Sequence, residues 1–390
     1  MSEPTAALVE AVRDRLAREP GELTPHRVAD ALRTAGRPVG DATVLAVHEV
    51  LRRDVVGAGP LEPLLRLPGV TDVLVNGPEA VHLDRGRGLE PAGVTFPDDE
   101  AVRRLAQRLA ATAGRRLDDA TPFVDVRLRD GTRCHAVLAP VARPGTSVSL
   151  RVPARRTLAL PDLVAAGTLS HQGAELLTSV VTGRLAFLVT GGTGVGKTTL
   201  LASLLGLVDP RERLVLVEDA SELRPDHPHV VGLEARPPNI EGVGEVTVRT
   251  LVRQALRMRP DRLVVGEVRD GSVVDLLAAL NTGHEGGCGT LHANSAADVP
   301  ARVEALAMAA GWSRAATHGQ LASALDVVLH LGRVEGRRVL REVAVPVRDR
   351  AGWVAMETAV HFDDEGRAHT GPGAGDLERR LGRGSRPAAS

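Results

Sequence analysis

Residues 189–205 read VTGGTGVGKTTLLASLL, and residues 191–198 within them match the pattern G-x-x-x-x-G-K-[ST]. An apolar segment at 185–190 precedes the pattern, and an apolar segment with helical character follows it. Glycines in such a loop let backbone N–H groups surround a phosphate chain, and the start of the next helix favours the same negative charge. The stretch therefore predicts a strand, a phosphate loop and a helix that together bind a nucleoside triphosphate.

The lysine of this loop stands apart in the composition. Of 48 Lys and Arg residues only Lys197 is lysine, which leaves 47 arginines. A planar arginine fork does not replace a compact ammonium inside a phosphate loop. We expect Lys197 to reach the β- and γ-phosphates and the Thr198 hydroxyl to bind Mg²⁺, so ATP and Mg²⁺ are the expected cofactors. A glycine-rich turn without a ligand is the alternative. The predicted nucleotide-binding residues are Gly191, Gly192, Thr193, Gly194, Val195, Gly196, Lys197, Thr198 and Thr199.

The length, composition and net charge of the chain limit the class of protein to which it can belong. A chain of 390 residues with 25% charged and 43% hydrophobic residues is typical of a soluble protein with about two domains. A net charge of −1 and 2% aromatic residues disfavour stable nucleic-acid binding. Cys134 and Cys288 form no metal or disulfide framework and are interpreted as packing residues. Neither a signal peptide nor an apolar run of about 20 residues is evident, so we expect a cytoplasmic protein without a transmembrane segment.

The pattern of hydrophobic and polar residues changes along the chain. We predict a helical N-terminal extension at residues 1–50 and a smaller α+β domain at 51–155. Residues 156–370 alternate helices with short apolar strands, which predicts an α/β domain with a mainly parallel sheet. Residues 371–390 are rich in Gly, Pro, Ser and Arg and are expected to be a disordered tail.

Acidic residues follow the apolar strand at 213–217. In an open α/β sheet the carboxyl ends of the strands face the ligand. We therefore predict that Glu218 is a catalytic acid and an Mg²⁺ ligand, direct or through water. Asp219 and Glu222 have the spacing of a helix capping box as well as of a functional pair, and the two interpretations stay equal for them.

Two further stretches carry candidate catalytic groups. Glu267 follows the strand at 263–265. Many phosphate-loop enzymes have an aspartate one residue before this glutamate, and this chain has Gly266 at that position. A glutamate there is suited to orient or deprotonate the attacking water. His284 and His292 lie in the glycine-rich stretch 281–295 and are interpreted as sensors or polarisers of the γ-phosphate. A zinc site is disfavoured because the histidines and Cys288 lack repeated ligand spacing.

These four motifs, in this order, resemble the secretion ATPases of the type II/type IV superfamily. They correspond to its Walker A loop, Asp box, atypical Walker B and His box. The resemblance is closest to the Tad-pilus (CpaF-like) branch, which includes the TadA family of conjugal transfer-associated ATPases. It covers roughly residues 51–294 and includes GAGPLEPLLRLPGVTDVLVNGP at 57–78 in the first domain.

The resemblance implies a RecA-like domain in a homo-oligomer, a hexameric ring, that hydrolyses ATP and powers Tad-type pilus assembly or secretion. It implies association with the inner face of the membrane through an inner-membrane platform protein. It also assigns arginine fingers to Arg133 and Arg151, and an ordinary surface role for these arginines is the less favoured alternative. The catalytic residues expected in this way are Glu267, Glu218, Glu222, His284, His292, Arg133 and Arg151. Two alternatives stay open: a DNA-translocating or conjugation-associated RecA-like ring motor, and a nucleotide-gated assembly factor with negligible turnover.

Overall fold

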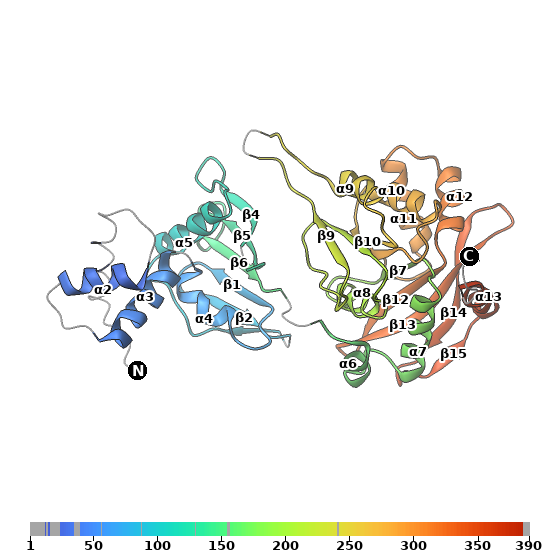
Figure 1. The fold of residues 1–390 in the computed structure, drawn as a ribbon, viewed down its shortest axis with the longest axis horizontal. Helices are drawn as coiled ribbons and strands as arrows, with labels where there is room; N and C mark the ends of the chain where they lie inside the picture. The colour runs from blue at the N-terminus through green and yellow to red at the C-terminus, as the bar shows by residue number, and fades with distance from the viewer. Residues whose placement is uncertain are drawn as a thin grey trace. The chain divides into compact units, whose positions relative to one another are not determined.

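The computed structural model divides the chain into two compact units, Met1–Ala154 and Arg155–Ser390 (Figure 1). It describes residues 24–34, 40–55, 57–86, 88–128, 130–153, 157–239 and 242–384, together with Val12 and Arg15. Of the predicted N-terminal extension, the described part holds the helices α2 (Pro25–Thr34) and α3 (Asp41–Val55), and the rest of that prediction lies outside the described residues.

The first unit contains an antiparallel six-stranded sheet in the order β3-β2-β1-β6-β5-β4. Buried and more exposed residues alternate along its strands, as in β1 where Val73 and Val75 are buried. This alternation is typical of a sheet with one covered face. The strands are β1 (Asp72–Asn76), β2 (Val81–Asp84), β3 (Leu89–Pro91), β4 (Phe123–Arg127), β5 (Arg133–Val137) and β6 (Ser147–Arg151).

The helix α5 (Asp99–Thr112) belongs to the same hydrophobic core as this sheet. Its buried residues, among them Val102, Leu105 and Leu109, recur at the spacing of one helical face. Asp98 caps the helix by accepting a hydrogen bond from the Ala101 amide at 2.7 Å. Two short helices, η1 (Gly59–Leu61) and α4 (Glu62–Leu65), add buried leucines to this core.

The second unit is built on a nine-stranded sheet in the order β15-β14-β13-β12-β7-β11-β10-β8-β9. Neighbouring strands are parallel from β12 through β7, β11, β10 and β8 to β9. They are antiparallel from β12 through β13 and β14 to β15. The predicted α/β fold is therefore confirmed. The strands are β7 (Phe187–Thr190), β8 (Leu214–Glu218), β9 (Val230–Glu234), β10 (Arg262–Val268), β11 (Cys288–Leu291), β12 (Val327–Val334), β13 (Arg337–Arg348), β14 (Val354–Phe362) and β15 (Ala368–Thr370).

Helices form two layers, one for each face of this sheet (Figure 1). One core contains residues of α6 (Leu160–Ala165), α7 (His171–Thr182) and α8 (Lys197–Leu205). The other contains residues of four helices: α9 (Val248–Ala255), α10 (Ser272–Leu280), α11 (Val299–Ala309) and α12 (Arg314–Ala324). All residues of β7 and β8 are buried, which is expected for central strands covered on both faces.

The C-terminal part corrects one prediction. Residues 374–384 were expected to be disordered, but they form the helix α13 (Ala374–Gly384). Its Leu377 is buried in the first of these two cores, and Arg380 donates a 2.8 Å hydrogen bond to Asp326. A polar composition predicted disorder, yet these few contacts hold the segment on the sheet. Residues 385–390 lie outside the described residues.

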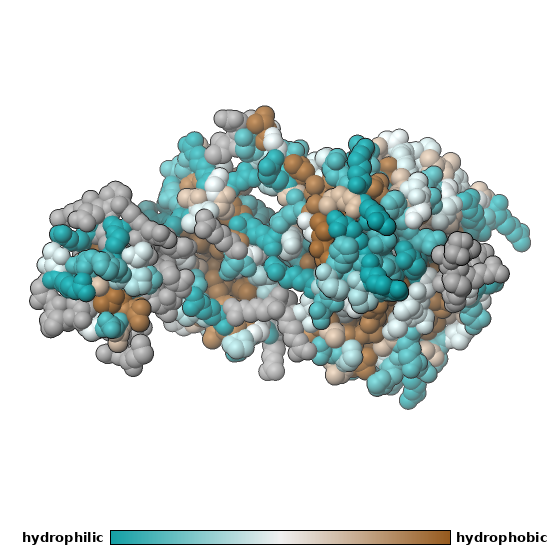
Figure 2. Space-filling view, in the orientation of Figure 1, coloured by the Kyte–Doolittle hydropathy of each residue, from teal (hydrophilic) through white to brown (hydrophobic). Residues whose placement is uncertain are grey.

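Figure 2 shows hydrophilic residues over much of the visible face, with hydrophobic residues between them. The exposed large hydrophobic side chains come from separate parts of the chain, namely Leu45, Leu67, Leu89, Phe123, Val141, Val243 and Met308. Scattered apolar side chains of this kind are normal on a protein surface. Among the described residues, no helix has both the length and the apolar character needed to cross a bilayer.

Candidate nucleotide site

The phosphate loop connects the end of β7 to the first residue of α8. Gly191, Gly194 and Gly196 have φ angles of 144°, 70° and 97°, which favour glycine. A Cβ atom on Gly191 would also lie 2.5 Å from the carbonyl oxygen of Leu331 on β12. The loop conformation therefore depends on its glycines, in the way that close backbone approach to a phosphate chain requires.

Lys197 lies inside this loop and is only 7% exposed. Its Nζ donates hydrogen bonds to the carbonyl oxygens of Gly191 at 3.0 Å and Gly192 at 2.7 Å. Burial lowers the pKa of Lys197, and the negative charge of Glu267 opposes that change. The ammonium is thus held by the loop itself, at the place where the sequence motif provides a partner for phosphate oxygens.

His292 and Glu267 extend the cluster from the neighbouring strands β11 and β10. His292 Nδ1 lies 3.4 Å from Lys197 Nζ, and His292 Nε2 lies 2.8 Å from Glu267 Oε1. Burial and the charge of Lys197 lower the pKa of His292, and the nearby carboxylate of Glu267 opposes that change. The structure brings these three predicted site residues together although they are far apart in the sequence.

The carboxylate of Glu267 is ionised, and one of its two oxygens accepts no hydrogen bond from the described residues. Burial alone raises its pKa, but the hydrogen bond and charge of Arg269, with the charges of His292 and Lys197, bring that pKa below its ordinary value. The close contact with His292 lacks hydrogen-bond geometry, and Oε1 of Glu267 is a buried oxygen without a donor among the described residues. This oxygen is suited to accept a hydrogen bond from a water molecule. Arg269, which the sequence analysis missed, pairs with the other carboxylate oxygen.

Glu218 has a different environment. Its Oε1 accepts hydrogen bonds from the amides of Glu222 at 3.0 Å and Leu223 at 2.9 Å. Burial raises the pKa of Glu218 to about 7, against the effect of these two hydrogen bonds. No described helix begins at residues 219–222, so the capping-box interpretation of Asp219 and Glu222 is wrong. The loop is instead held by the carboxylate of Glu218.

The contact between Glu218 and β10 explains the missing aspartate at Gly266. A Cβ atom at that position would lie 2.6 Å from Cγ of Glu218, so only glycine fits there. The side chain of Glu218 reaches across β10, and β11 still separates it from the phosphate loop.

The residues around the loop fit an Mg²⁺–nucleotide complex in part. Thr198 follows Lys197 in the first turn of α8, and its hydroxyl is a hard oxygen of the kind that Mg²⁺ prefers. The unpaired Oε1 of Glu267 offers a second oxygen that a metal-bound water could approach. Glu218 is less well placed, because its Oε1 is engaged by backbone amides.

The structure does not bring His284 to the phosphate loop. The stretch 281–295 is not one loop, because β11 lies between the two histidines. β11 runs parallel to β7, so His292 lies at the edge where the phosphate loop begins and His284 lies at the opposite edge. A common γ-phosphate role for both histidines of one chain is therefore wrong. His284 Nδ1 contacts the carbonyl oxygen of Ala279 at 3.2 Å.

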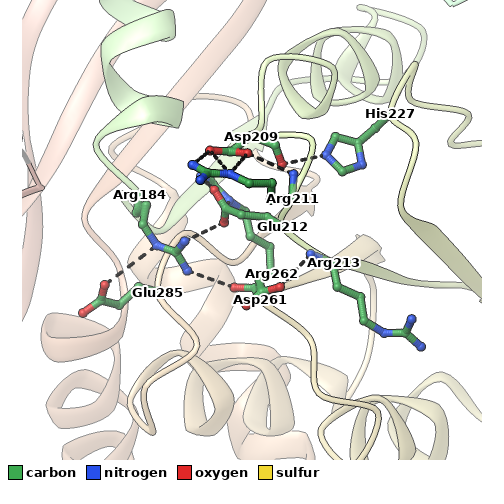
Figure 3. A network of polar contacts seen from close by, with 9 residues as sticks. All are labelled: Arg184, Asp209, Arg211, Glu212, Arg213, His227, Asp261, Arg262 and Glu285. Atoms are coloured by element: carbon green, nitrogen blue, oxygen red, sulfur yellow. Dashed lines mark hydrogen bonds and ion pairs between the residues drawn. The ribbon is translucent and has the colours of Figure 1, made fainter. Parts of the chain in front are cut away.

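That opposite edge carries a separate network of charged groups (Figure 3). Arg262 is 2% exposed and donates two hydrogen bonds to Glu212, of 3.0 and 3.1 Å. Arg184 donates to Glu212 at 2.6 Å and lies 3.9 Å from Glu285, the neighbour of His284. The network joins the segments that lead into β7, β8, β10 and β11, and so stabilises the sheet from the edge away from the loop.

Arg133 and Arg151 belong to the first unit and are exposed. They oppose each other on the paired strands β5 and β6. Arg133 makes two hydrogen bonds to Asp125, of 3.1 and 2.7 Å. Their predicted role as arginine fingers stays a prediction.

Further residues of the second unit approach the loop without any signal in the local sequence. His330 on β12 contacts the hydroxyl of Thr190, the last residue before the loop, at 3.0 Å. Arg333 on the same strand donates to the carbonyl oxygen of Gly194 at 3.1 Å. A cavity of about 410 Å³ lies beside the loop and is lined by Gly191, Gly192 and His292 on one side and by α11 on the other. About 140 residues separate His330 and Arg333 from the loop, so only the fold reveals them.

Comparisons with known proteins show which proteins this chain is similar to. A putative conjugal transfer protein of Mycobacterium tuberculosis is 58% identical over 332 residues, covering 83% of this chain and 94% of that protein. The probable conjugal transfer protein TrbB of Sinorhizobium fredii is 32% identical, covering 74% of this chain and 87% of its own. The crystal structure of the pilus retraction motor PilT with bound ADP is similar in fold, with a TM-score of 0.51, 19% identity, and coverage of 81% of this chain and 84% of PilT.

The family of type II/IV secretion system proteins matches residues 54–368, which include the first sheet, the second sheet up to the first residue of β15, and every residue of the cluster around Lys197. The chain therefore belongs to the type II/IV secretion system protein family.

Proposed function

We propose that this chain is a motor ATPase that hydrolyses ATP to ADP and phosphate. The contact series Lys197–His292–Glu267 at the phosphate loop is the observation that carries the proposal. It combines a cation for the phosphates with an ionised carboxylate whose Oε1 accepts no hydrogen bond from the described residues. The family supports the same activity, and PilT, a structural neighbour by fold, is described with bound ADP.

The reaction follows from these groups. Water attacks the γ-phosphorus in line, and the bond from that phosphorus to the β–γ bridging oxygen breaks. Glu267 accepts a hydrogen bond from the water through Oε1 and orients or deprotonates it. Lys197 leaves its carbonyl partners and stabilises the charge on the phosphate oxygens. Mg²⁺, held by Thr198 and phosphate oxygens, would neutralise part of the same charge when bound.

The finer assignment is a motor for Tad-type pilus assembly or secretion. In this proposal the chain works as a hexameric ring, lies in the cytoplasm and acts on an inner-membrane platform protein. Arg133 and Arg151 then supply cations to the nucleotide when the first domain covers it. The order of the four motifs and the resemblance of residues 57–78 support this branch.

The test of hydrolysis is steady-state turnover of the full chain beside Glu267→Gln. The amide keeps the shape of the side chain but cannot take a proton, so turnover falls about a hundredfold or more. ATP affinity stays within a few-fold, because Lys197 and the loop amides remain. An equal loss of affinity and turnover would assign Glu267 to binding, and a wild-type chain without turnover contradicts the proposal.

A conjugation-associated DNA motor is the second candidate, because two relatives are described as conjugal transfer proteins. Stimulation of turnover by DNA, with a steep decrease as salt rises, would support this function over pilus assembly. The net charge of −1 favours the result that DNA does not stimulate turnover.

A further inference from the structure

Two arginines of the β12–β13 hairpin lie against the outer side of the phosphate loop. Arg333 and Arg338 are directly opposed in the antiparallel pair, so their side chains share one face of the hairpin. Arg333 Nη2 donates to the carbonyl oxygen of Gly194 at 3.1 Å. Cδ of Arg338 lies 3.5 Å from the position that a Cβ atom would take on Gly196. Both side chains therefore adjoin the loop just before α8 begins.

The charges of this pair are not balanced within the chain. Like charges directly opposed across two strands destabilise a sheet. Among the described residues neither Arg333 nor Arg338 makes an ion pair, whereas many other arginines of the second unit do. The neighbouring loop amides and the start of α8 also favour an anion at this place. An uncompensated pair of cations beside an anion-binding loop fits a phosphate group that is shared with the loop.

The sheet order indicates which part of the nucleotide the pair faces. Glu267 and His292 come from β10 and β11, on one side of β7. They mark the γ-phosphate end, because the attacking water belongs there. Arg333 and Arg338 come from β12 and β13, on the other side of β7. In a triphosphate whose γ-phosphate faces Glu267 and His292, the α-phosphate is the phosphate furthest from them, and the arginine pair lies on the side of β7 away from them.

We infer that Arg333 and Arg338 bind the nucleotide at its α-phosphate, as a second cationic group opposite Glu267 and His292. The inference rests on the proposed function, since it assumes that the loop binds ATP. It concerns affinity for the nucleotide and does not involve the hydrolytic step.

The experiment measures ATP and ADP binding to the full chain and to Arg333→Gln, Arg338→Gln and the double variant. Glutamine removes the charge and keeps the polar character of the side chain, and Arg333→Lys tests the part that depends on charge alone. We expect affinity to fall about tenfold or more in the double variant, by the same factor for ATP and ADP, because both carry the α-phosphate. Arg337→Gln is the matched control, because Arg337 opposes Val334 and lies on the other face of the hairpin. Its affinity stays at the wild-type value.

Three results would overturn the inference. If the double variant equals Arg337→Gln in affinity, the pair binds no phosphate. A loss for ATP alone would assign the pair to the γ-phosphate. Loss of affinity in Arg333→Gln that Arg333→Lys fails to restore would assign Arg333 to loop geometry. If the wild-type chain binds neither ATP nor ADP, the proposed function itself fails. If the wild-type chain binds both but does not hydrolyse ATP, the affinities of the variants can still be compared with that of the wild type. Thermal melting without nucleotide shows that each variant is folded.

Discussion

At the scale of single residues, Lys197 has the most demanding position. Its Nζ lies within hydrogen-bond distance of two loop carbonyls and near His292. Arginine keeps the charge but places a wide planar fork where a compact ammonium fits. We expect Lys197→Arg to reduce ATP turnover to background. Steady-state phosphate release checks this, and near-normal turnover would mean that the loop has no special need for lysine.

Glu218 predicts a pH dependence of stability. Its pKa is about 7 in the folded chain, against 4.5 for an ordinary glutamate. The folded chain therefore holds this proton more tightly, and the free energy of unfolding decreases as pH rises from about 4.5 to 7. The loss is on the order of 3 kcal/mol. Glutamine resembles the protonated acid and does not titrate.

We therefore expect the Tm of Glu218→Gln to increase relative to wild type between pH 5 and pH 8. Parallel melting curves over this range check the expectation. A constant difference in Tm at all pH values would contradict the raised pKa, because Glu218 would then bind its proton equally in the folded and unfolded chain.

At the scale of elements, the loops on the far edge of the second sheet depend on one partly buried carboxylate. Glu212 accepts hydrogen bonds from Arg262 and Arg184 (Figure 3). Glu212→Ala leaves the Arg262 charge buried without a partner, which costs about 3–5 kcal/mol. We expect Tm to fall on the order of 10 °C.

Asp209→Ala is the matched control for this variant. Asp209 pairs with Arg211, whose side chain is 89% exposed, and both lie in the same region of Figure 3. Exposed pairs contribute little, so Tm should hardly change. Equal effects of the two substitutions would contradict the special role of Glu212.

The elements also show what a sequence can predict here. The phosphate loop was predictable because its residues are contiguous and their chemistry requires that order. β11 was missed because its glycine disfavours a strand in isolation. In the sheet a Cβ on Gly289 would lie 2.5 Å from the Val265 carbonyl oxygen, so packing requires the glycine.

Contacts distant in the sequence were not predictable in the same way. Arg333 meets Gly194 across 139 residues, and no local pattern marks either the contact or its register. α13 was missed because composition alone predicted disorder, whereas in the fold Leu377 is buried and Arg380 bonds to Asp326, a contact distant in the sequence.

At the scale of the whole molecule, the division into two units allows a direct test of the arginine fingers. If Arg133 and Arg151 act on the nucleotide, the second unit alone, Arg155–Ser390, binds ATP but hydrolyses it poorly. Arginine fingers contribute factors of about 10³ to 10⁵ in related chemistry, so turnover should fall by about a thousandfold. Full activity of the isolated unit would exclude the first domain from the reaction.

Point variants of the full chain refine that test. Arg133→Ala and Arg151→Ala should each lower turnover, whereas Arg104→Ala on α5 should not. Arg104 is a suitable control because it is exposed in the same unit and forms only a 3.8 Å ion pair with Glu100.

Because the chain has a single lysine, chemical modification of that lysine can report nucleotide binding. An amine-reactive acylating reagent has two kinds of target here, the α-amino group and Nζ of Lys197. Because Lys197 lies within the loop, a bound nucleotide would shield it, and the acylated fraction of one peptide would measure occupancy. Mass spectrometry could then titrate nucleotide binding on the unaltered protein, without a fluorescent analogue.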